Sequence, residues 1–227
     1  MSGRLLVIGH RGWPARFPDN TLAGLIAAAD VADGVEVDVR RCGDGRLVLS
    51  HDPFLHDRAV AETSWAVLSE LDLGEGHHPV LLDEALAALP GISVQLEVKN
   101  MPFDPGFEPD HRIALETAER ARPGDVVTSF NTETLSAVRR VFPDVATGMV
   151  TQASIALGEA IEHCLHAGHT TLIPNHSQVT SEINADIAVF PWTVNDPIRA
   201  RELADSGVRG IITDDPGRMV TDLGTET

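Results

Sequence analysis

The feature that most constrains this chain of 227 residues is a repeated alternation of short apolar runs with longer segments of helical pattern. β-branched residues dominate most of the runs, which is typical of strands buried on both faces of a sheet. Strands that alternate with helices predict a parallel sheet with right-handed crossovers. The runs span residues 5–8, 35–39, 94–98, 126–129, 147–150, 171–173, 187–194 and 210–213.

Helical patterns fill most of the intervals between these runs. Asn20 is a suitable N-cap for a helix over residues 21–29. Gly124, Gly168 and Gly207 follow other helical patterns, at the positions where C-terminal caps are expected. The remaining predicted helices span residues 83–89, 112–122, 132–141, 154–166 and 197–206, with a single weak turn at 179–184.

Eight strand–helix repeats favour closure into a TIM-type (β/α)₈ barrel of the α/β class, although an open doubly wound sheet also fits the pattern. No linker or low-complexity segment divides the chain, so residues 1–227 are expected to form a single domain. A short excursion at about 40–81 separates the second and third strands, and it opens with a hairpin over residues 41–51. Residues 101–109 carry three prolines and are expected to form a loop over one end of the barrel.

The formal net charge of −17 restricts the partners of the chain. An acidic surface repels nucleic acid phosphates and anionic lipid, so neither is expected to bind stably. No apolar stretch is long enough for a membrane span. Cys42 and Cys164 form no Cys-x-x-Cys pair, which favours free thiols in a reducing cytoplasm. The oligomeric state stays open.

Two acidic residues lie inside the second apolar run, in Glu36-Val37-Asp38. Side chains alternate across a strand, so Glu36 and Asp38 share one face. Buried carboxylates repel each other and persist only where positive charge lies between them. The alternative is a salt bridge to Arg40 or Arg41, or a strand end that is exposed to water.

The third run adds a further carboxylate and the only lysine of the chain, because Gln95, Glu97 and Lys99 share one strand face. If both strands turn these faces into the barrel mouth, Glu36, Asp38 and Glu97 converge. Three hard oxygen donors suit one divalent cation, Mg²⁺ or Ca²⁺, better than zinc. The alternative is a simple ion pair between Glu97 and Lys99.

Two histidines flank this carboxylate set. His10 and His51 each follow a predicted strand, and strand C-termini form the end of a barrel where chemistry occurs. Histidine transfers protons near neutral pH, so this pair is predicted to act in acid–base catalysis. Arg11 is suited to bind a phosphate oxygen with its guanidinium group.

The other histidines have no evident carboxylate partners. His163 and His166 have a spacing that resembles a metal site on a helix, and His169 follows them. His77 and His78 are adjacent in the excursion. We predict that both groups are surface residues.

A series of short motifs runs along nearly the whole chain. They are His10-Arg11-Gly12, Pro18-Asp19-Asn20-Thr21, Glu36-Val37-Asp38-Val39, Asp44-Gly45, His51-Asp52-Pro53, Glu97-Val98-Lys99, Ser129-Phe130, Trp192-Thr193-Val194-Asn195 and Gly210-Ile211-Ile212-Thr213-Asp214. Each motif is weak alone, but the series in this order is highly specific. It resembles the glycerophosphodiester phosphodiesterase family.

The resemblance implies a PLC-like phosphodiesterase barrel that hydrolyses glycerophosphodiesters to glycerol 3-phosphate and an alcohol. It implies that His10 and His51 are the catalytic acid–base pair. By the same resemblance, Glu36, Asp38 and Glu97 are the ligands of one divalent cation.

The resemblance also implies how substrate is held. Arg11 and Lys99 become phosphate contacts, and Trp192 becomes a wall near the glycerol moiety. Asn20 supports the first loop.

The chain departs from the family pattern at three places. Asp19 stands where the family usually has Glu, and its side chain is one methylene shorter, which is expected to alter a supporting contact. Trp13 is bulky for its position after His-Arg-Gly and predicts a narrower pocket. The segment after His51 is shorter than the inserted subdomain of some relatives, which leaves the preferred alcohol open.

Two other functions are compatible with these residues. A phospholipase D-like enzyme of related fold needs an apolar rim facing a membrane, and 4% aromatic residues with strong negative charge argue against it. A non-catalytic protein that binds metal or phosphoesters is expected to lack a histidine or carboxylate of the set, and none is missing here.

Overall fold

The eight apolar runs form the strands of a nearly closed parallel barrel in the computed structural model of the chain, which describes residues 4–224. Neighbouring strands follow the order β10-β9-β8-β7-β6-β2-β1-β11, and all of these pairs are parallel. The TIM-type barrel is confirmed, and the open doubly wound sheet is excluded. The barrel strands are β1 (Leu6–Gly9), β2 (Gly34–Arg41), β6 (Ser93–Val98), β7 (Val126–Ser129), β8 (Ala146–Thr151), β9 (Thr171–Pro174), β10 (Ala188–Val189) and β11 (Gly210–Thr213).

The barrel closes between β10 and β11 through separate backbone hydrogen bonds instead of a regular ladder. The amide of Arg209 donates to the carbonyl oxygen of Val189 over 2.9 Å. The amide of Ile212 donates to the carbonyl oxygen of Pro191 over 2.9 Å. Strand β10 is therefore much shorter than the predicted run of 187–194. Pro191 has no N–H to donate, which is consistent with the early end of this strand.

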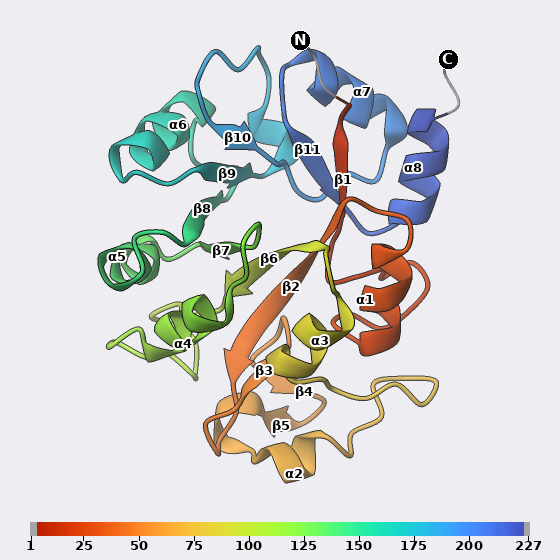
Figure 1. The fold of residues 1–227 in the computed structure, drawn as a ribbon, viewed down its shortest axis with the longest axis vertical. Coiled ribbons are helices and arrows are strands. Elements are labelled where there is room, and N and C mark those ends of the chain that lie inside the picture. Colours follow the sequence, from red (N-terminus) through yellow and green to blue (C-terminus); the bar gives the residue numbers. More distant parts are fainter. Residues whose placement is uncertain (1–3, 225–227) are drawn as a thin grey trace.

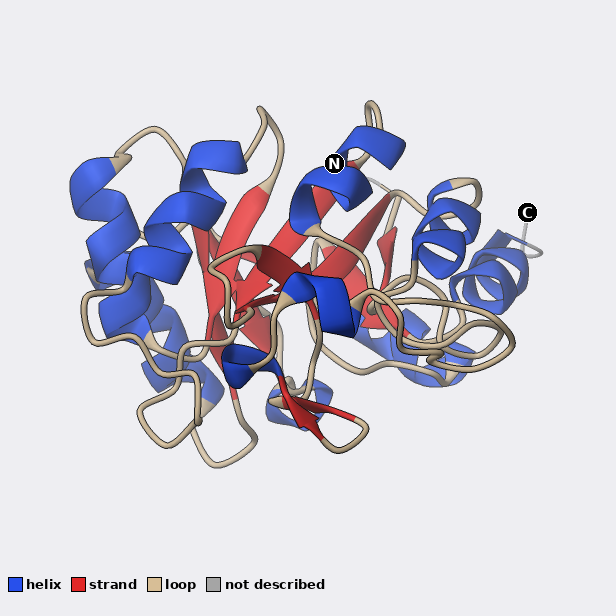
Figure 2. Cartoon of the chain, turned by 90° about the horizontal axis from the view of Figure 1, so that it is seen from below, coloured by secondary structure: helices blue, strands red, loops and turns tan. Residues whose placement is uncertain are grey.

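Helices surround the strands, as Figure 2 shows. The six predicted helices are present, with ends that differ by a few residues. Helices α2 and α8 lie outside the predicted segments, and the weak turn predicted at 179–184 is replaced by a 3₁₀ turn at His176–Gln178. The helices are α1 (Leu22–Ala29), α2 (Trp65–Leu68), α3 (Leu82–Ala88), α4 (Arg112–Arg120), α5 (Thr132–Val141), α6 (Leu157–His166), α7 (Pro197–Asp205) and α8 (Pro216–Gly224).

The excursion between β2 and β6 opens with the predicted hairpin. Strand β2 continues past the barrel and pairs antiparallel with β3 (Leu47–Leu49). The small strands β4 (Phe54–Leu55) and β5 (Arg58–Ala59), a 3₁₀ turn at Val60–Glu62 and helix α2 follow. In Figure 1 these elements lie at the bottom of the view, away from both ends of the chain. They enclose a small apolar cluster of their own, which contains Cys42, Val48, Val60 and Leu68.

The two faces of β2 have different surroundings. Val35, Val37 and Val39 belong to the apolar layer between the strands and the helices, together with Leu25 and Ala28 of α1. The intervening side chains therefore point to the inside of the barrel, because side chains alternate along a strand. A separate apolar cluster of Ile8, Val150, Ile173, Phe190 and Ile212 joins β1, β8, β9, β11 and the segment after β10.

His169 contradicts the prediction that it lies at the surface. Its side chain is buried just before β9, and its Nδ1 atom lies 2.9 Å from Thr147 Oγ1. Burial, together with the positive charge of Arg139, lowers the pKa of His169 to about 4. His163 and His166 are exposed as predicted, because they point away from the barrel on α6.

We expect His169→Gln to reduce the loss of stability in acid. An unfolded chain takes up a proton near the ordinary histidine pKa of 6.5, whereas the folded protein does so only near pH 4. The wild type therefore loses stability as the pH falls through this interval, by up to roughly 3 kcal/mol. Urea unfolding at about pH 7 and about pH 4.5 measures the difference. His166→Gln should follow the wild type, and an unchanged pH dependence in His169→Gln would contradict a buried neutral imidazole.

Candidate active site

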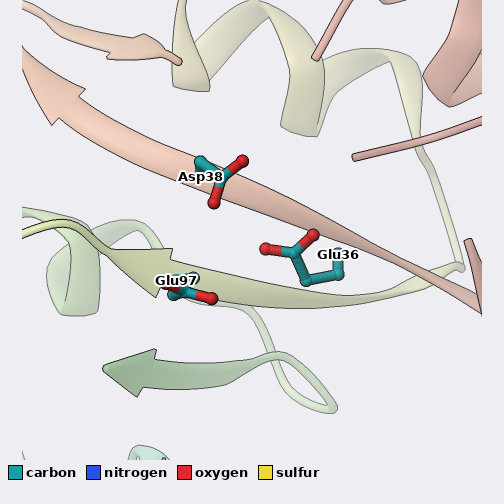
Figure 3. A group of neighbouring side chains, drawn as sticks. All are labelled: Glu36, Asp38 and Glu97. Carbon is teal, nitrogen blue, oxygen red and sulfur yellow. The ribbon is translucent and has the colours of Figure 1, made fainter. Parts of the chain in front are cut away.

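Three carboxylates meet on the inner face of two neighbouring strands. Glu36 and Asp38 belong to β2, Glu97 belongs to β6, and Asp38 is paired in register with Glu97. One carboxylate oxygen from each residue lies within 4.8 Å of the other two. Figure 3 shows the three groups turned toward one another. Glu36 and Asp38 are almost completely buried, so their charges are poorly screened by water.

Two cations pair with this cluster. Lys99 Nζ lies 2.7 Å from Asp38 Oδ1 and also forms an ion pair with Glu97. Arg11 Nε lies 3.2 Å from Asp38 Oδ2 on the other side. The ion pair between Glu97 and Lys99 is thus present, as one of the two interpretations of the sequence predicted.

Arg40 and Arg41 do not neutralise the cluster, which excludes the alternative salt bridge. Both arginines point to the loop and helix that follow β6. Arg40 pairs with Asp104 at 3.0 Å, and Arg41 pairs with Glu108 and with Glu116 of α4.

Asn20 holds Asp38 in place from the loop between β1 and α1. Its Nδ2 atom donates to Asp38 Oδ2 over 2.8 Å, and the backbone amide of Asp38 donates to Asn20 Oδ1 over 3.1 Å. Asn20 adopts a left-handed backbone conformation with φ of 59°, which asparagine tolerates better than most residues. The predicted N-cap role is wrong, because the helix is preceded by Thr21 instead.

The loop after β1 is tight at Gly12. A Cβ atom there would lie 2.8 Å from the carbonyl carbon of Gly24 in α1, and the backbone φ of Gly12 is 91°. This close packing places the amide of Arg11 3.0 Å from Glu36 Oε2, to which it donates. The glycine of the His-Arg-Gly motif therefore brings a backbone donor to the carboxylate cluster.

The pKa values of the two β2 carboxylates move in opposite directions. Burial and the negative charge of Asp38 raise the pKa of Glu36 to about 8. Burial also acts to raise the pKa of Asp38, but Lys99 and Arg11 outweigh it and hold that pKa well below its usual range. Glu36 Oε1 is buried and has no hydrogen-bond partner among the described residues.

His10 is oriented by a carboxylate from the last strand. Its Nδ1 atom lies 2.7 Å from Asp214 Oδ1, and Asn195 Nδ2 donates to Asp214 Oδ2 over 2.7 Å. Burial lowers the pKa of His10, but the hydrogen bond to Asp214 and the charge of Glu36 outweigh it and raise that pKa. The sequence motifs predict no role for Asp214 or Asn195, although each residue directly follows an apolar run.

His51 lies at the end of the predicted hairpin, which returns it toward the site. It follows the antiparallel strand β3, which runs back toward the barrel, and not the end of a barrel strand. Its carbonyl oxygen accepts hydrogen bonds from Arg40 Nε and Nη2 at 3.0 and 2.8 Å. The imidazole remains accessible, and its Nδ1 atom lies 2.9 Å from Asp52 Oδ1.

Trp192, Asp19 and Trp13 each have a defined contact near the site. Trp192 packs edge-on against Phe130 at a ring distance of 5.6 Å. Asp19 accepts a hydrogen bond from Arg11 Nη1 over 2.8 Å, so the shorter side chain still makes a supporting contact. Trp13 does not narrow the pocket as predicted. Its indole is buried against Gly217 of α8 and donates to Asp215 over 2.9 Å.

Comparison with known proteins identifies the family of the chain. The sequence pattern of the glycerophosphoryl diester phosphodiesterase family matches residues 10–218. The chain belongs to this family. It is an enzyme, a glycerophosphodiester phosphodiesterase.

Relatives of this phosphodiesterase align with it over nearly their whole length. A glycerophosphodiester phosphodiesterase of Caldanaerobacter subterraneus is 28% identical, and the alignment covers 96% of this chain and 97% of the relative. One of Bacillus subtilis is 25% identical, with 94% and 84% covered. A phosphodiesterase of Oleispira antarctica, solved in complex with the product sn-glycerol-3-phosphate, shares the fold with a TM-score of 0.83 and 24% identity, and 97% of each chain is covered. No helix among residues 4–224 of the phosphodiesterase is long and apolar enough to cross a membrane.

The carboxylate cluster of the phosphodiesterase fits a divalent metal ion, which the family generally binds. Three carboxylates face two cations, and one of these cations, Arg11, is shared with Asp19. Without a further cation Glu36 stays protonated up to about pH 8, and its Oε1 atom is available for a further partner. Ionisation of all three carboxylates therefore calls for more positive charge than Lys99 and Arg11 supply. Carboxylate oxygens are the donors that Mg²⁺ and Ca²⁺ prefer.

We expect Glu36→Gln to abolish stabilisation by metal without weakening the metal-free protein. An amide is uncharged, like the protonated Glu36 of the metal-free protein at neutral pH, and it is a poor replacement for a charged ligand. Mg²⁺ or Ca²⁺ at about a hundred times its Kd should stabilise the wild type by about 2.7 kcal/mol, which corresponds to roughly 5 °C or more in Tm. Thermal unfolding with and without the ion measures this shift. The exposed Glu159→Gln is the control and should respond like the wild type. An equal shift in Glu36→Gln would remove Glu36 from the metal site.

Proposed function

We propose that this phosphodiesterase hydrolyses glycerophosphodiesters to glycerol 3-phosphate and an alcohol in a metal-dependent reaction, with His10 and His51 as the acid–base pair. The observation that carries this proposal is the convergence of the carboxylate cluster and His10 at the same end of β1 and β2. The sn-glycerol-3-phosphate bound to the Oleispira antarctica relative supports the identity of the product.

Glu36, Asp38 and Glu97 are the proposed ligands of one divalent cation, Mg²⁺ or Ca²⁺. When bound, the ion supplies positive charge opposite the phosphate oxygens, where negative charge grows in the transition state. The carboxylates cannot bind phosphate themselves, because like charges repel. The neutral or cationic groups around them must therefore hold the rest of the substrate.

Arg11 and Lys99 are the proposed phosphate contacts. Both are only partly exposed and both already pair with Asp38, so their charged groups are held at the edge of the cluster. Side chains that are fixed in this way lose little freedom when a phosphate binds. Trp192, which is held by Phe130, is the proposed wall beside the glycerol moiety.

His10 and His51 are the proposed proton carriers. Asp214 engages Nδ1 of His10, which leaves Nε2 free to exchange a proton with substrate. Asp52 engages Nδ1 of His51 in the same way. One histidine removes a proton from the attacking oxygen, and the other protonates the leaving alkoxide.

We also propose that the protein works in the cytoplasm and binds neither nucleic acid nor membrane stably. Cys42 and Cys164 are both buried and unpaired, which suits a reducing compartment. The net charge of −17 disfavours contact with polyanions and anionic lipid.

Turnover of glycerophosphocholine tests the proposed function. We expect glycerol 3-phosphate to be released, detected by a coupled dehydrogenase assay, and the rate to vanish in EDTA. Restoration by Mg²⁺ or by Ca²⁺ then identifies the ion that supports catalysis. Release of choline phosphate instead of glycerol 3-phosphate, or turnover of lysophospholipids alone, would contradict the proposal.

We expect His10→Ala and His51→Ala each to lower kcat by about 10²–10⁴-fold while the fold is retained. The kcat of Asp214→Asn should lie between that of His10→Ala and that of the wild type, because the imidazole stays but loses its charged partner. Steady-state kinetics at saturating metal, with circular dichroism to verify folding, provides the measurement. His78→Ala, an exposed histidine of the excursion, is the matched control. Near-wild-type turnover in either catalytic variant would exclude that histidine from the mechanism.

A further inference from the structure

A cavity of about 190 Å³ lies beside His51, between the loop that follows β1 and the excursion. Arg11 and His51 line one side of it. Pro18 lines it from the β1–α1 loop, and Leu55 and Leu73 line it from the excursion. The cavity is thus continuous with the proposed phosphate and proton-transfer groups, yet it contains none of the metal-binding carboxylates.

Three polar side chains of this cavity are already bonded to other groups of the protein. Asn20 is bonded to Asp38, Asp19 to Arg11, and Ser50 Oγ to the carbonyl of Asp52. A glycerol moiety bound here would find few free donors or acceptors on these three side chains. A largely hydrocarbon group would bury apolar surface against the leucine and proline side chains.

The two walls of the cavity are held together across a long separation in sequence. Phe17 packs edge-on against His77 of the excursion at a ring distance of 5.8 Å. A Cβ atom on Gly74 would lie 3.6 Å from Pro18 Cγ, so these two segments are in close contact. Such packing favours a pocket that exists before substrate binds and that sets a size limit.

We propose that this cavity binds the alcohol substituent of the diester and that Leu73 limits its size. The inference rests on the proposed function and adds where the alcohol lies and which residue selects it. His51 borders the cavity, so an alkoxide leaving from it has a proton donor beside it. The volume of about 190 Å³ fits a compact group such as choline. Phe54, which is about half exposed at the cavity, adds an aromatic face that suits a quaternary ammonium group.

The test compares two substrates that differ only in the alcohol, the choline ester and the methyl ester of glycerol 3-phosphate. Leu73→Trp fills the cavity, and Leu73 lies outside the apolar clusters of the described chain, so the fold should be retained. We expect kcat/KM for the choline ester to fall about 10-fold or more, and that for the methyl ester to stay within roughly twofold. Val67→Trp places the same indole on the exposed side of the excursion and should leave both values unchanged.

A complementary variant keeps the test decisive if the indole is not tolerated. Leu73→Ala enlarges the cavity and should raise kcat/KM for the bulkier inositol ester relative to the choline ester. Equal losses for the choline and methyl esters in a folded Leu73→Trp, unchanged values for both, or an unchanged ratio in Leu73→Ala would overturn the inference while the proposed function stands. Absence of turnover of every ester by the wild type would overturn the proposed function, and this inference with it.

Discussion

The mutual repulsion of three carboxylates on one patch of the barrel interior is the constraint on which the surrounding structure depends. Parallel pairing of β2 and β6 in register brings Asp38 and Glu97 side by side. Glu36 lies two residues before Asp38, on the same face of β2. In a buried setting this arrangement persists only with compensating charge and hydrogen bonds. Lys99, Arg11 and Asn20 supply part of that compensation, and a divalent cation would supply the rest when all three carboxylates are ionised.

Closure of the barrel brings a histidine to the edge of this cluster. Strand β1 pairs with β11 so that Gly9 is opposite Thr213, and the residues that follow them, His10 and Asp214, therefore meet. The residues that follow the first and last strands thus form one hydrogen-bonded pair of side chains, His10 and Asp214. Because the strand ends are fixed by backbone ladders, a small barrel can hold these groups without a large inserted subdomain. The chain belongs to the glycerophosphoryl diester phosphodiesterase family.

The excursion between β2 and β6 contributes a histidine that no barrel strand carries. Its antiparallel strand β3 returns His51 to the site, and Arg40 fixes the backbone at that residue while it also binds Asp104 of the loop after β6. The remainder of the excursion packs against the β1–α1 loop through Phe17 and His77. Variation in the excursion can therefore alter the pocket beside His51 without disturbing the carboxylates, which are held by strands.

The sequence by itself determined the alternation of strands and helices, the hairpin and the faces on which Glu36, Asp38 and Glu97 lie, because hydrophobic periodicity and strand alternation are local properties. Only the tertiary structure decided which charges pair, that Asn20 binds Asp38 instead of capping a helix, and that His169 is buried. It also decided that Asp214 orients His10, since these residues are more than two hundred positions apart. Such contacts depend on strand register, loop path and barrel closure, and periodicity carries no information about any of them.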